Sequence, residues 1–171
     1  HTILVQDNAG FGAGFENTDY EKAGAKISAT AKDIFNESEM IVKVKEPLTN
    51  EVAMLRENQI LFTYLHLAAA PELTKGLIES KAICIAYETV TDEFNRLPLL
   101  APMSAVAGRM SIQAGAHSLE KPQNGRGLLI GGAPGVNPGN VLILGGGVVG
   151  ENAAIIATGM QAKVSIVDKS S

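Results

Sequence analysis

The 171-residue sequence contains a single cysteine, Cys84, which lies in the apolar run Ile83–Ile85. One cysteine excludes an intramolecular disulfide, and it also excludes a metal site built on a Cys-x-x-Cys pair. The charge balance lacks a basic excess, with 14 Lys and Arg against 18 Asp and Glu. This balance argues against a nucleic-acid partner, because proteins that bind nucleic acids usually present a basic field.

Long hydrophobic runs are also missing, since Gly, Pro or a charged residue interrupts every apolar stretch before it reaches the length of a membrane span. No secretory signal is recognisable in the sequence. We therefore expect no membrane association and, with one thiol, a location in the reducing cytoplasm. The hydrophobic share of 46% and the charged share of 19% are typical of a chain that buries a core.

Short apolar strands alternate with stretches that resemble helices. The strand candidates are rich in β-branched or aromatic residues and cover Thr2–Gln6, Met40–Lys45, Gln59–Leu65 and Ala82–Tyr87. Between them, Thr49–Asn58 predicts a helix with Thr49 as its N-cap, and Ala70–Ser80 predicts one with Pro71 in its first turn. Such alternation predicts an α/β fold with a parallel sheet covered on both faces.

A longer helix is predicted over Pro102–Lys121, where Gly108 and Gly115 allow close packing. We interpret it as the connection between two lobes. The glycine-rich run Asn124–Gly139 predicts loop, short strand and a domain boundary. The predicted domains are therefore residues 1–101, the connecting helix 102–121, and residues 122–171.

The second half of the sequence has the full setting of a dinucleotide-binding motif. The strand Val141–Leu144 leads into a G-x-G-x-x-G turn, a helix follows, and the strand Lys163–Val167 ends at Asp168. Asp168 lies 18 residues after the last glycine of the motif, close to the spacing expected for a ribose-binding acid. This combination is more specific than the glycine spacing alone.

The glycines of this motif have separate predicted roles. Gly145 allows a tight turn, Gly147 lets the main chain approach a pyrophosphate, and Gly150 lets helix and strand pack closely. The main-chain N–H groups around Val148 and Val149 would point at the phosphates from the helix N-terminus, where the helix dipole favours anions.

The acidic residue predicts which dinucleotide is bound. Asp168 would accept hydrogen bonds from both hydroxyls of the adenosine ribose. Its negative charge would repel a 2′-phosphate, so the motif favours NAD over NADP. The alternative is a βαβ unit that binds no ligand.

Three ionisable residues in the first half are ambiguous on the sequence alone. His66 interrupts the apolar stretch Leu61–Leu73, and a lone histidine in such a setting is more often a satisfied core side chain than a catalytic group. Lys43 and Lys45 alternate along a predicted strand and would share one face. Without further information, both lysines are best interpreted as solvated charges at a strand end.

Several motifs in order are similar to those of the alanine dehydrogenase family, which also includes the NAD-binding subunit of proton-translocating transhydrogenase. The resemblance covers essentially the whole chain and rests on Val42–Pro47, Leu61–Thr74, Ile85–Val90, Leu97–Ser104, Val106–Met110, Gly131–Val136 and Val141–Gly150. It implies a flavodoxin-like substrate lobe and a Rossmann lobe that binds NAD, with the active site between them. It further implies reversible oxidative deamination of L-alanine to pyruvate and ammonium, commonly by a homohexamer.

The resemblance also implies roles for individual residues. His66 matches a histidine that accepts and donates protons, a task that suits an imidazole at neutral pH. Lys45, rather than Lys43, matches a lysine that binds the substrate carboxylate or polarises the carbonyl of pyruvate. Ser104 matches a serine that contacts the dinucleotide, although a helix N-cap or a buried hydroxyl is an equally good interpretation. Glu88 is interpreted as a structural carboxylate at a strand end.

Two other functions remain open at this point. One is the NAD-binding subunit of a transhydrogenase, against which His66 and Lys45 both argue, because that branch of the family lacks them. The other is a non-catalytic remnant. The family pattern further includes an arginine motif before the first residue of this sequence and a second half of the Rossmann lobe after the last, so we expect the chain to be a fragment of a longer enzyme.

Overall fold

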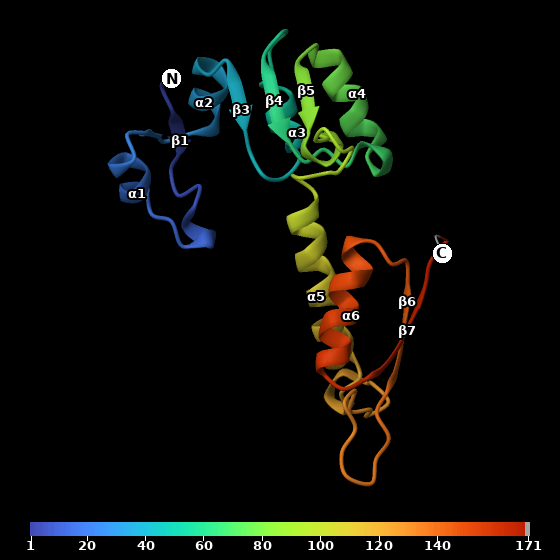
Figure 1. Cartoon of the computed structure of the whole chain (residues 1–171). Coiled ribbons are helices and arrows are strands. Elements are labelled where there is room, and N and C mark those ends of the chain that lie inside the picture. The colour runs from blue at the N-terminus through green and yellow to red at the C-terminus, as the bar shows by residue number, and fades with distance from the viewer. Residues whose placement is uncertain (170–171) are drawn as a thin grey trace. The chain divides into compact units, whose positions relative to one another are not determined.

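The structure is a computed structural model that describes residues 1–169. It divides into two compact units, the first from His1 to Val90 and the second beginning at Thr91. Each unit has its own strands (Figure 1). Each also has its own buried core. The strand pairs β1–β2, β3–β4, β4–β5 and β6–β7 are all parallel, which confirms the predicted α/β class.

The first unit begins with a small sheet of two strands. Its elements are, in chain order, β1 (Leu4–Gln6), α1 (Asn17–Lys22), β2 (Lys26–Ser28) and α2 (Ala31–Glu37). The hydroxyl of Thr30 caps α2 by accepting a hydrogen bond from the Asp33 N–H at 3.2 Å. Only β1 was predicted, because the other three elements are short and carry charged residues that hide the apolar pattern.

A three-stranded parallel sheet forms the rest of this unit. Its strands β3 (Met40–Val42), β4 (Ile60–Thr63) and β5 (Ile83–Ala86) lie in the order β3-β4-β5, and the helices α3 (Thr49–Val52) and α4 (Pro71–Ser80) connect them. The core gathers around the central strand, where Leu61 is fully buried among Phe35, Ile41, Leu55, Leu65 and Leu77. Burial of each of these side chains contributes about 1.5–3 kcal/mol to stability. Their packing against one another holds the three strands in place.

The predicted strands of this sheet and the helix at Thr49 are all shorter than expected. The helix predicted over Thr49–Asn58 ends at Val52, and its N-cap is Leu48 rather than Thr49. The side chain of Glu51 accepts the Leu48 N–H at 2.7 Å and so takes the capping role predicted for the threonine hydroxyl. The strand predicted to Lys45 ends at Val42, although main-chain hydrogen bonds to β4 continue for two more residues.

The second unit is built from two helices and a parallel strand pair. Its elements are α5 (Ala101–Ser118), β6 (Asn140–Leu144), α6 (Val148–Gly159) and β7 (Lys163–Val167). Figure 1 shows α5 and α6 side by side, and the contact is close at Gly108, where an added Cβ would lie 2.2 Å from the carbonyl oxygen of Val149. The prediction of close packing is therefore correct for Gly108 but wrong for Gly115, around which a Cβ would meet no described atom within 4 Å.

The glycine-rich run Asn124–Gly139 is an irregular segment inside the second unit, between the short 3-10 helix Lys121–Gln123 and β6. The break between the two compact units falls after Val90. The predicted boundaries at residues 101 and 121, which separate the two lobes from the connecting helix, stay predictions. Within residues 1–169, no helix has the length and apolar character that crossing a membrane requires.

Candidate functional site

The strand β6 runs directly into the glycine turn and then into α6, as the sequence predicted. Gly145 has a φ of +102°, a conformation that side-chain-bearing residues rarely adopt, and its N–H donates to the carbonyl of Val167 at 2.7 Å. A Cβ added at Gly150 would lie only 1.8 Å from the carbonyl oxygen of Gly145. Gly145 and Gly150 are thus required by the local geometry, for the reasons that their positions in the motif suggested.

Gly147 is different, because its surroundings are open. It precedes α6 as the N-cap, and a Cβ built there would meet no atom of residues 1–169 within 4 Å. The first N–H groups of a helix have no partner inside the helix, and in α6 these belong to Val148 and Val149. A phosphate that approached the main chain at Gly147 would therefore reach unpaired donors at the positive end of the helix dipole.

Asp168 follows β7 directly and lies beside the glycine turn. One of its carboxylate oxygens accepts a short hydrogen bond from the N–H of Gly146. The acid and the turn are therefore held together at the carboxyl ends of two neighbouring parallel strands, which is where ligands bind in open α/β sheets. This arrangement, with the open main chain at Gly147, fits a dinucleotide.

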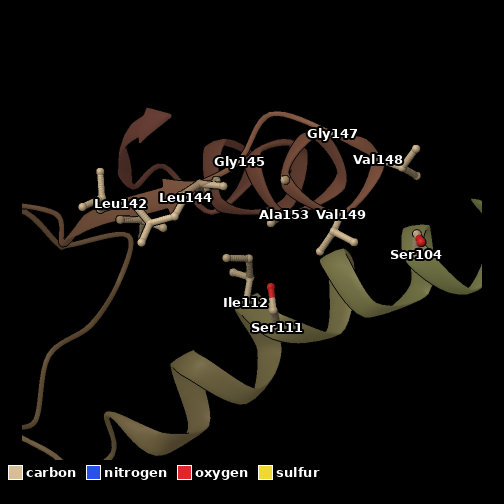
Figure 2. A pocket seen from close by; sticks show the side chains of 13 residues that line it. Ser104, Ser111, Ile112, Leu142, Leu144, Gly145, Gly147, Val148, Val149 and Ala153 are labelled. Atoms are coloured by element: carbon tan, nitrogen blue, oxygen red, sulfur yellow. The ribbon is translucent and has the colours of Figure 1, made fainter. Parts of the chain in front are cut away.

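A cavity of about 450 Å³ lies along the glycine turn (Figure 2). Its walls come from α5, β6, the turn and α6, and they include Ser104, Ser111, Ile112, Leu144, Gly145, Gly147, Val149 and Ala153. Ser104 and Ser111 lie on α5, which runs alongside the turn and α6 in Figure 2. The cavity thus brings the predicted residue Ser104 together with the predicted glycines.

Ser104 does not cap its helix. The helix α5 starts at Ala101, with Leu100 as its N-cap, so Ser104 already lies in the first turn and its N–H donates to the carbonyl of Leu100 at 3.0 Å. The N-cap interpretation of Ser104 is wrong, because Leu100 occupies the N-cap position. The side chain is half-buried, and the dinucleotide contact stays a prediction.

A second cavity of about 580 Å³ shares Ser104 and Val148 with the first. The loop before α5 forms its wall, with Asp92, Asn95, Arg96, Leu97 and Pro98. Asp92 organises this loop by accepting the N–H groups of Phe94 and Arg96, each at 2.9 Å, and the Arg96 Nε at 2.7 Å. These bonds, led by the main-chain N–H of Arg96, lower the pKa of the Asp92 carboxyl.

The first unit holds the other predicted site residues, beginning with His66. This residue follows β4 in a left-handed conformation, with φ 50° and ψ 38°. A residue with a side chain adopts this region at a cost of roughly 1–2 kcal/mol, so surrounding contacts must hold it. The side chain is about half exposed, at 54%, which rules out the satisfied core histidine that the sequence alone favoured.

Glu88 holds the main chain at this point. Its carboxylate accepts the N–H of Leu65 at 3.0 Å and the N–H of His66 at 2.7 Å. Burial alone would raise the pKa of the Glu88 carboxyl, but hydrogen bonds from the main chain of His66, Glu88 and Leu65 more than offset that effect and lower it. The contacts therefore support the interpretation of Glu88 as a structural carboxylate.

The imidazole of His66 has two neighbours that the sequence analysis missed. Its Nδ1 lies 3.2 Å from a carboxylate oxygen of Glu46, and its ring stacks on Tyr64 with centroids 5.9 Å apart and an angle of 18° between the planes. Hydrogen bonds from its own main chain and from His66 lower the pKa of the Glu46 carboxyl. Glu46 immediately follows Lys45, and Tyr64 lies two residues before His66, so both belong to motifs on which the family resemblance rests. This proximity in sequence was the available signal for their place beside His66.

The structure separates the two lysines that the sequence could not. Lys43 is mostly buried and forms a short ion pair with Glu51. Lys45 is exposed, and among residues 1–169 no carboxylate lies within ion-pair distance of its ammonium group. Its main chain is fixed, since its carbonyl accepts the Thr63 hydroxyl at 2.7 Å. Lys43 is thus occupied by its ion pair with Glu51, whereas the ammonium group of Lys45 is accessible to a ligand.

A metal centre is not assembled by this part of the chain. In residues 1–169, no group of three or more His, Cys, Asp or Glu residues is arranged to hold a metal ion. Cys84 is a free thiol on β5, and burial raises its pKa.

Comparison with known proteins agrees with both halves of this description. Residues 1–107 match the model of the alanine dehydrogenase/PNT N-terminal domain, and residues 111–171 match that of the alanine dehydrogenase/PNT C-terminal domain. The chain is 58% identical to an alanine dehydrogenase of Halomonas elongata over 170 residues, which are 99% of this chain and 46% of that protein. It is 56% identical to one of Methanococcus maripaludis, covering 98% of this chain and 45% of the relative.

Solved structures give the same picture. An L-alanine dehydrogenase structure superposes with a TM-score of 0.87 at 55% identity and covers 98% of this chain and 46% of its own. A transhydrogenase from Sinorhizobium meliloti superposes with a TM-score of 0.77 at 23% identity, which shows a shared fold; it covers 99% of this chain and 50% of its own. The chain spans a little under half the length of the curated relatives it matches. With both domain models matched in order along the chain, it belongs to the alanine dehydrogenase/PNT family.

Proposed function

We propose that this chain is part of an NAD-dependent alanine dehydrogenase, which interconverts L-alanine with pyruvate and ammonium. The observation that carries the proposal is the 58% identity to an alanine dehydrogenase over 170 residues. The contrast with the transhydrogenase structure, at 23% identity, favours the dehydrogenase over the alternative in the same family. The exposed His66 and Lys45 favour it further, because amino-acid oxidation needs groups that bind a carboxylate and move protons.

The second unit supplies the cofactor site in this proposal. The N–H groups at the start of α6 hold the pyrophosphate beside Gly147, and Asp168 accepts the ribose hydroxyls. Ser104 adds a hydroxyl from the wall of the same cavity. When bound, NAD supplies the hydride acceptor for the substrate Cα.

The first unit supplies the substrate chemistry. The Lys45 ammonium binds the carboxylate of L-alanine or polarises the carbonyl of pyruvate. His66 takes up the proton released as the amine is oxidised to an iminium and water adds to that iminium, and it returns the proton in the reverse direction. In the forward direction one L-alanine, one NAD⁺ and one water give pyruvate, ammonium, NADH and a proton. We further propose that the enzyme acts in the cytoplasm as a homohexamer.

The test is an NADH absorbance assay on the intact protein with a panel of L-amino acids, together with the substitution His66→Ala. We expect turnover with L-alanine in the unaltered protein and loss of turnover in His66→Ala, with NAD binding retained. His117→Ala is the matched control, since His117 is similarly exposed and also lies beside a glutamate. Near-normal activity of His66→Ala would contradict the catalytic role.

The unaltered protein distinguishes the remaining alternatives. A transhydrogenase subunit would bind NAD but would not reduce it with L-alanine. A non-catalytic remnant would show neither a cooperative thermal transition nor saturable NAD binding. Sedimentation analysis of the active protein tests the hexamer.

A further inference from the structure

The imidazole of His66 can present either ring nitrogen to a substrate, and a contact between one of these nitrogens and Glu46 distinguishes the two orientations. The ring stacks on Tyr64 with an angle of 18° between the planes, which fixes its tilt. A rotation of 180° about the Cβ–Cγ bond would leave that plane unchanged while exchanging the position of Nδ1. Stacking alone therefore cannot select the ring orientation.

The hydrogen bonds of Glu88 do not reach the ring. The hydrogen bonds that join Glu88 to His66 run to the main chain, where the carboxylate accepts the His66 N–H at 2.7 Å. They hold the left-handed backbone of His66 and so fix the position of its Cβ atom. The ring nitrogens are instead contacted by Glu46, whose carboxylate lies 3.2 Å from Nδ1.

We propose that Glu46 is a positioning residue that fixes the orientation and tautomer of His66, so that Nε2 is the nitrogen that exchanges the proton with substrate. The inference rests on the proposed function only for its kinetic consequence. An ionised carboxylate can only accept a hydrogen bond, so the Nδ1 that faces it carries the hydrogen. The lone pair of the neutral ring then lies on Nε2, on the side of the ring away from Glu46.

Two further observations support this role. A glutamate carboxyl is ionised at neutral pH, as the contact requires, and the hydrogen bonds from its own main chain and from His66 lower its pKa further. The pair is also too exposed to be explained by stability, since the side chains of His66 and Glu46 are 54% and 41% exposed and exposed ion pairs contribute little. When the ring accepts a proton, the positive charge forms next to the carboxylate, as it does in other histidine–carboxylate pairs that orient a base.

The experiment compares Glu46→Leu with the intact unaltered protein labelled with ¹³C and ¹⁵N in histidine. Glu46→Leu removes the acceptor and keeps a side chain of similar length. The imidazole resonances of His66, assigned by their loss in His66→Gln, report the tautomer directly and do not require activity. We expect the Nδ1–H tautomer in the unaltered protein and a shift of population towards Nε2–H in Glu46→Leu.

The kinetic arm measures turnover of L-alanine. Because the substitution misdirects the base and leaves the substrate-binding lysine in place, kcat should fall roughly 10–100-fold while KM for L-alanine changes much less. Glu46→Gln keeps an acceptor oxygen without the charge, so its kcat should lie between that of the unaltered protein and that of Glu46→Leu. Circular dichroism of each variant checks that the fold is retained. Glu46→Asp keeps the carboxylate, so its kcat should be higher than that of Glu46→Leu, and this comparison remains possible if Glu46→Gln folds poorly.

A matched control is present in the chain. Glu120 lies 3.3 Å from Nδ1 of His117 in a somewhat more exposed pair, so Glu120→Leu removes the same kind of contact from a histidine with no assigned role. It should leave kcat unchanged. The proposal is overturned if His66 is Nε2–H in the unaltered protein, if Glu46→Leu leaves the tautomer unchanged, or if the tautomer shifts while kcat does not. Absence of L-alanine turnover in the unaltered protein would instead refute the proposed function, and the resonance shift would still decide what Glu46 does to the ring.

Discussion

The N–H of Gly146 donates a hydrogen bond to the carboxylate of Asp168, so the acidic residue that follows β7 also closes the glycine turn that follows β6. The two features were predicted as separate parts of a dinucleotide site, one for the ribose and one for the phosphates. Their direct contact means that they are not independent. A change at Asp168 alters both the ribose acceptor and the geometry of the turn.

Replacing Asp168 with Asn should therefore weaken NAD binding and relax the discrimination against NADP. The charged acceptor for the ribose is lost, which costs about 1.5–3 kcal/mol, or roughly 10–150-fold in affinity. The amide also removes the repulsion of a 2′-phosphate, so the affinity for NADP should fall less or rise. Calorimetric titration with NAD and NADP measures both.

The control for Asp168→Asn is Glu151→Gln, which removes a negative charge from the first turn of α6. This change makes the helix N-terminus no less favourable for phosphate, so NAD binding should not weaken. If Asp168→Asn binds NAD as tightly as the unaltered protein, the ribose role is wrong.

Two glycines of the turn should respond to substitution in different ways. Gly150→Ala should destabilise the second unit by about 1–3 kcal/mol, because the new Cβ would lie 1.8 Å from the Gly145 carbonyl oxygen and force the turn to move. Gly147→Ala should leave stability nearly unchanged, since a Cβ there meets open space, but it should weaken NAD binding by obstructing the approach of the pyrophosphate. Thermal melting and NAD titration separate the two effects.

Gly159→Ala is the matched control for this pair. It lies on the last turn of the same helix, and its Cβ would also meet open space. Stability and NAD affinity should both be retained. NAD binding that is unaffected by Gly147→Ala would show that the phosphates do not approach the main chain at this position.

How far the sequence predicted this site depends on how local each interaction is. The tight turn at Gly145 and the close packing at Gly150 follow from neighbouring residues of one motif, and both were predicted correctly. The setting of His66 depends on Glu46 and Glu88, which are 20 and 22 residues away along the chain and meet it only because β3, β4 and β5 are aligned. No periodicity in one segment reports such contacts, which is why the sequence alone favoured a buried histidine.

The same distinction explains the errors in the fold. The helix α4 was predicted accurately because Pro71 marks its start by its own chemistry. The helix at Thr49 was predicted too long, since Leu55 is apolar at helical spacing but reaches the core from beyond the end of α3. An apolar residue indicates that its side chain is buried. Whether it lies in a helix or in the loop that follows is decided by tertiary contacts.

The two lysines before Pro47 should differ when each is replaced with Met. Lys43→Met should lower stability by about 1–3 kcal/mol, because it leaves the mostly buried Glu51 carboxylate without its cation. Lys45→Met should change stability little, because the side chain is exposed, but it should raise KM for L-alanine roughly tenfold or more by removing a charged partner of the substrate carboxylate. Chemical denaturation and steady-state kinetics measure the two responses.

Each lysine variant serves as the control for the other. The prediction requires the stability effect and the KM effect to fall on different residues. If Lys43→Met raises KM and Lys45→Met does not, the assignment of the substrate-binding lysine must be exchanged.

The loop held by Asp92 should depend on pH in a defined direction. Hydrogen bonds from the main chain and guanidinium of Arg96 and from the Phe94 N–H lower the pKa of Asp92 below its ordinary value of about 3.8. A group whose pKa is lowered by folding contributes its full stabilisation above the ordinary pKa, and the contribution is lost as the pH falls through the lowered value. The loop should therefore be intact at neutral pH and should loosen only in acid.

The amide resonances of Phe94 and Arg96 report this transition, and their midpoint should lie below 3.8. Asp92→Asn should abolish the transition and loosen the loop at every pH, because the amide lacks the charge that the Arg96 guanidinium pairs with. Since Asp92 and Arg96 line the cavity that also contains Ser104 and Val148, this variant should also bind NAD less tightly at neutral pH. A midpoint at or above the ordinary value would mean that these hydrogen bonds do not hold the loop in solution, and the cavity would then not keep the shape described for it.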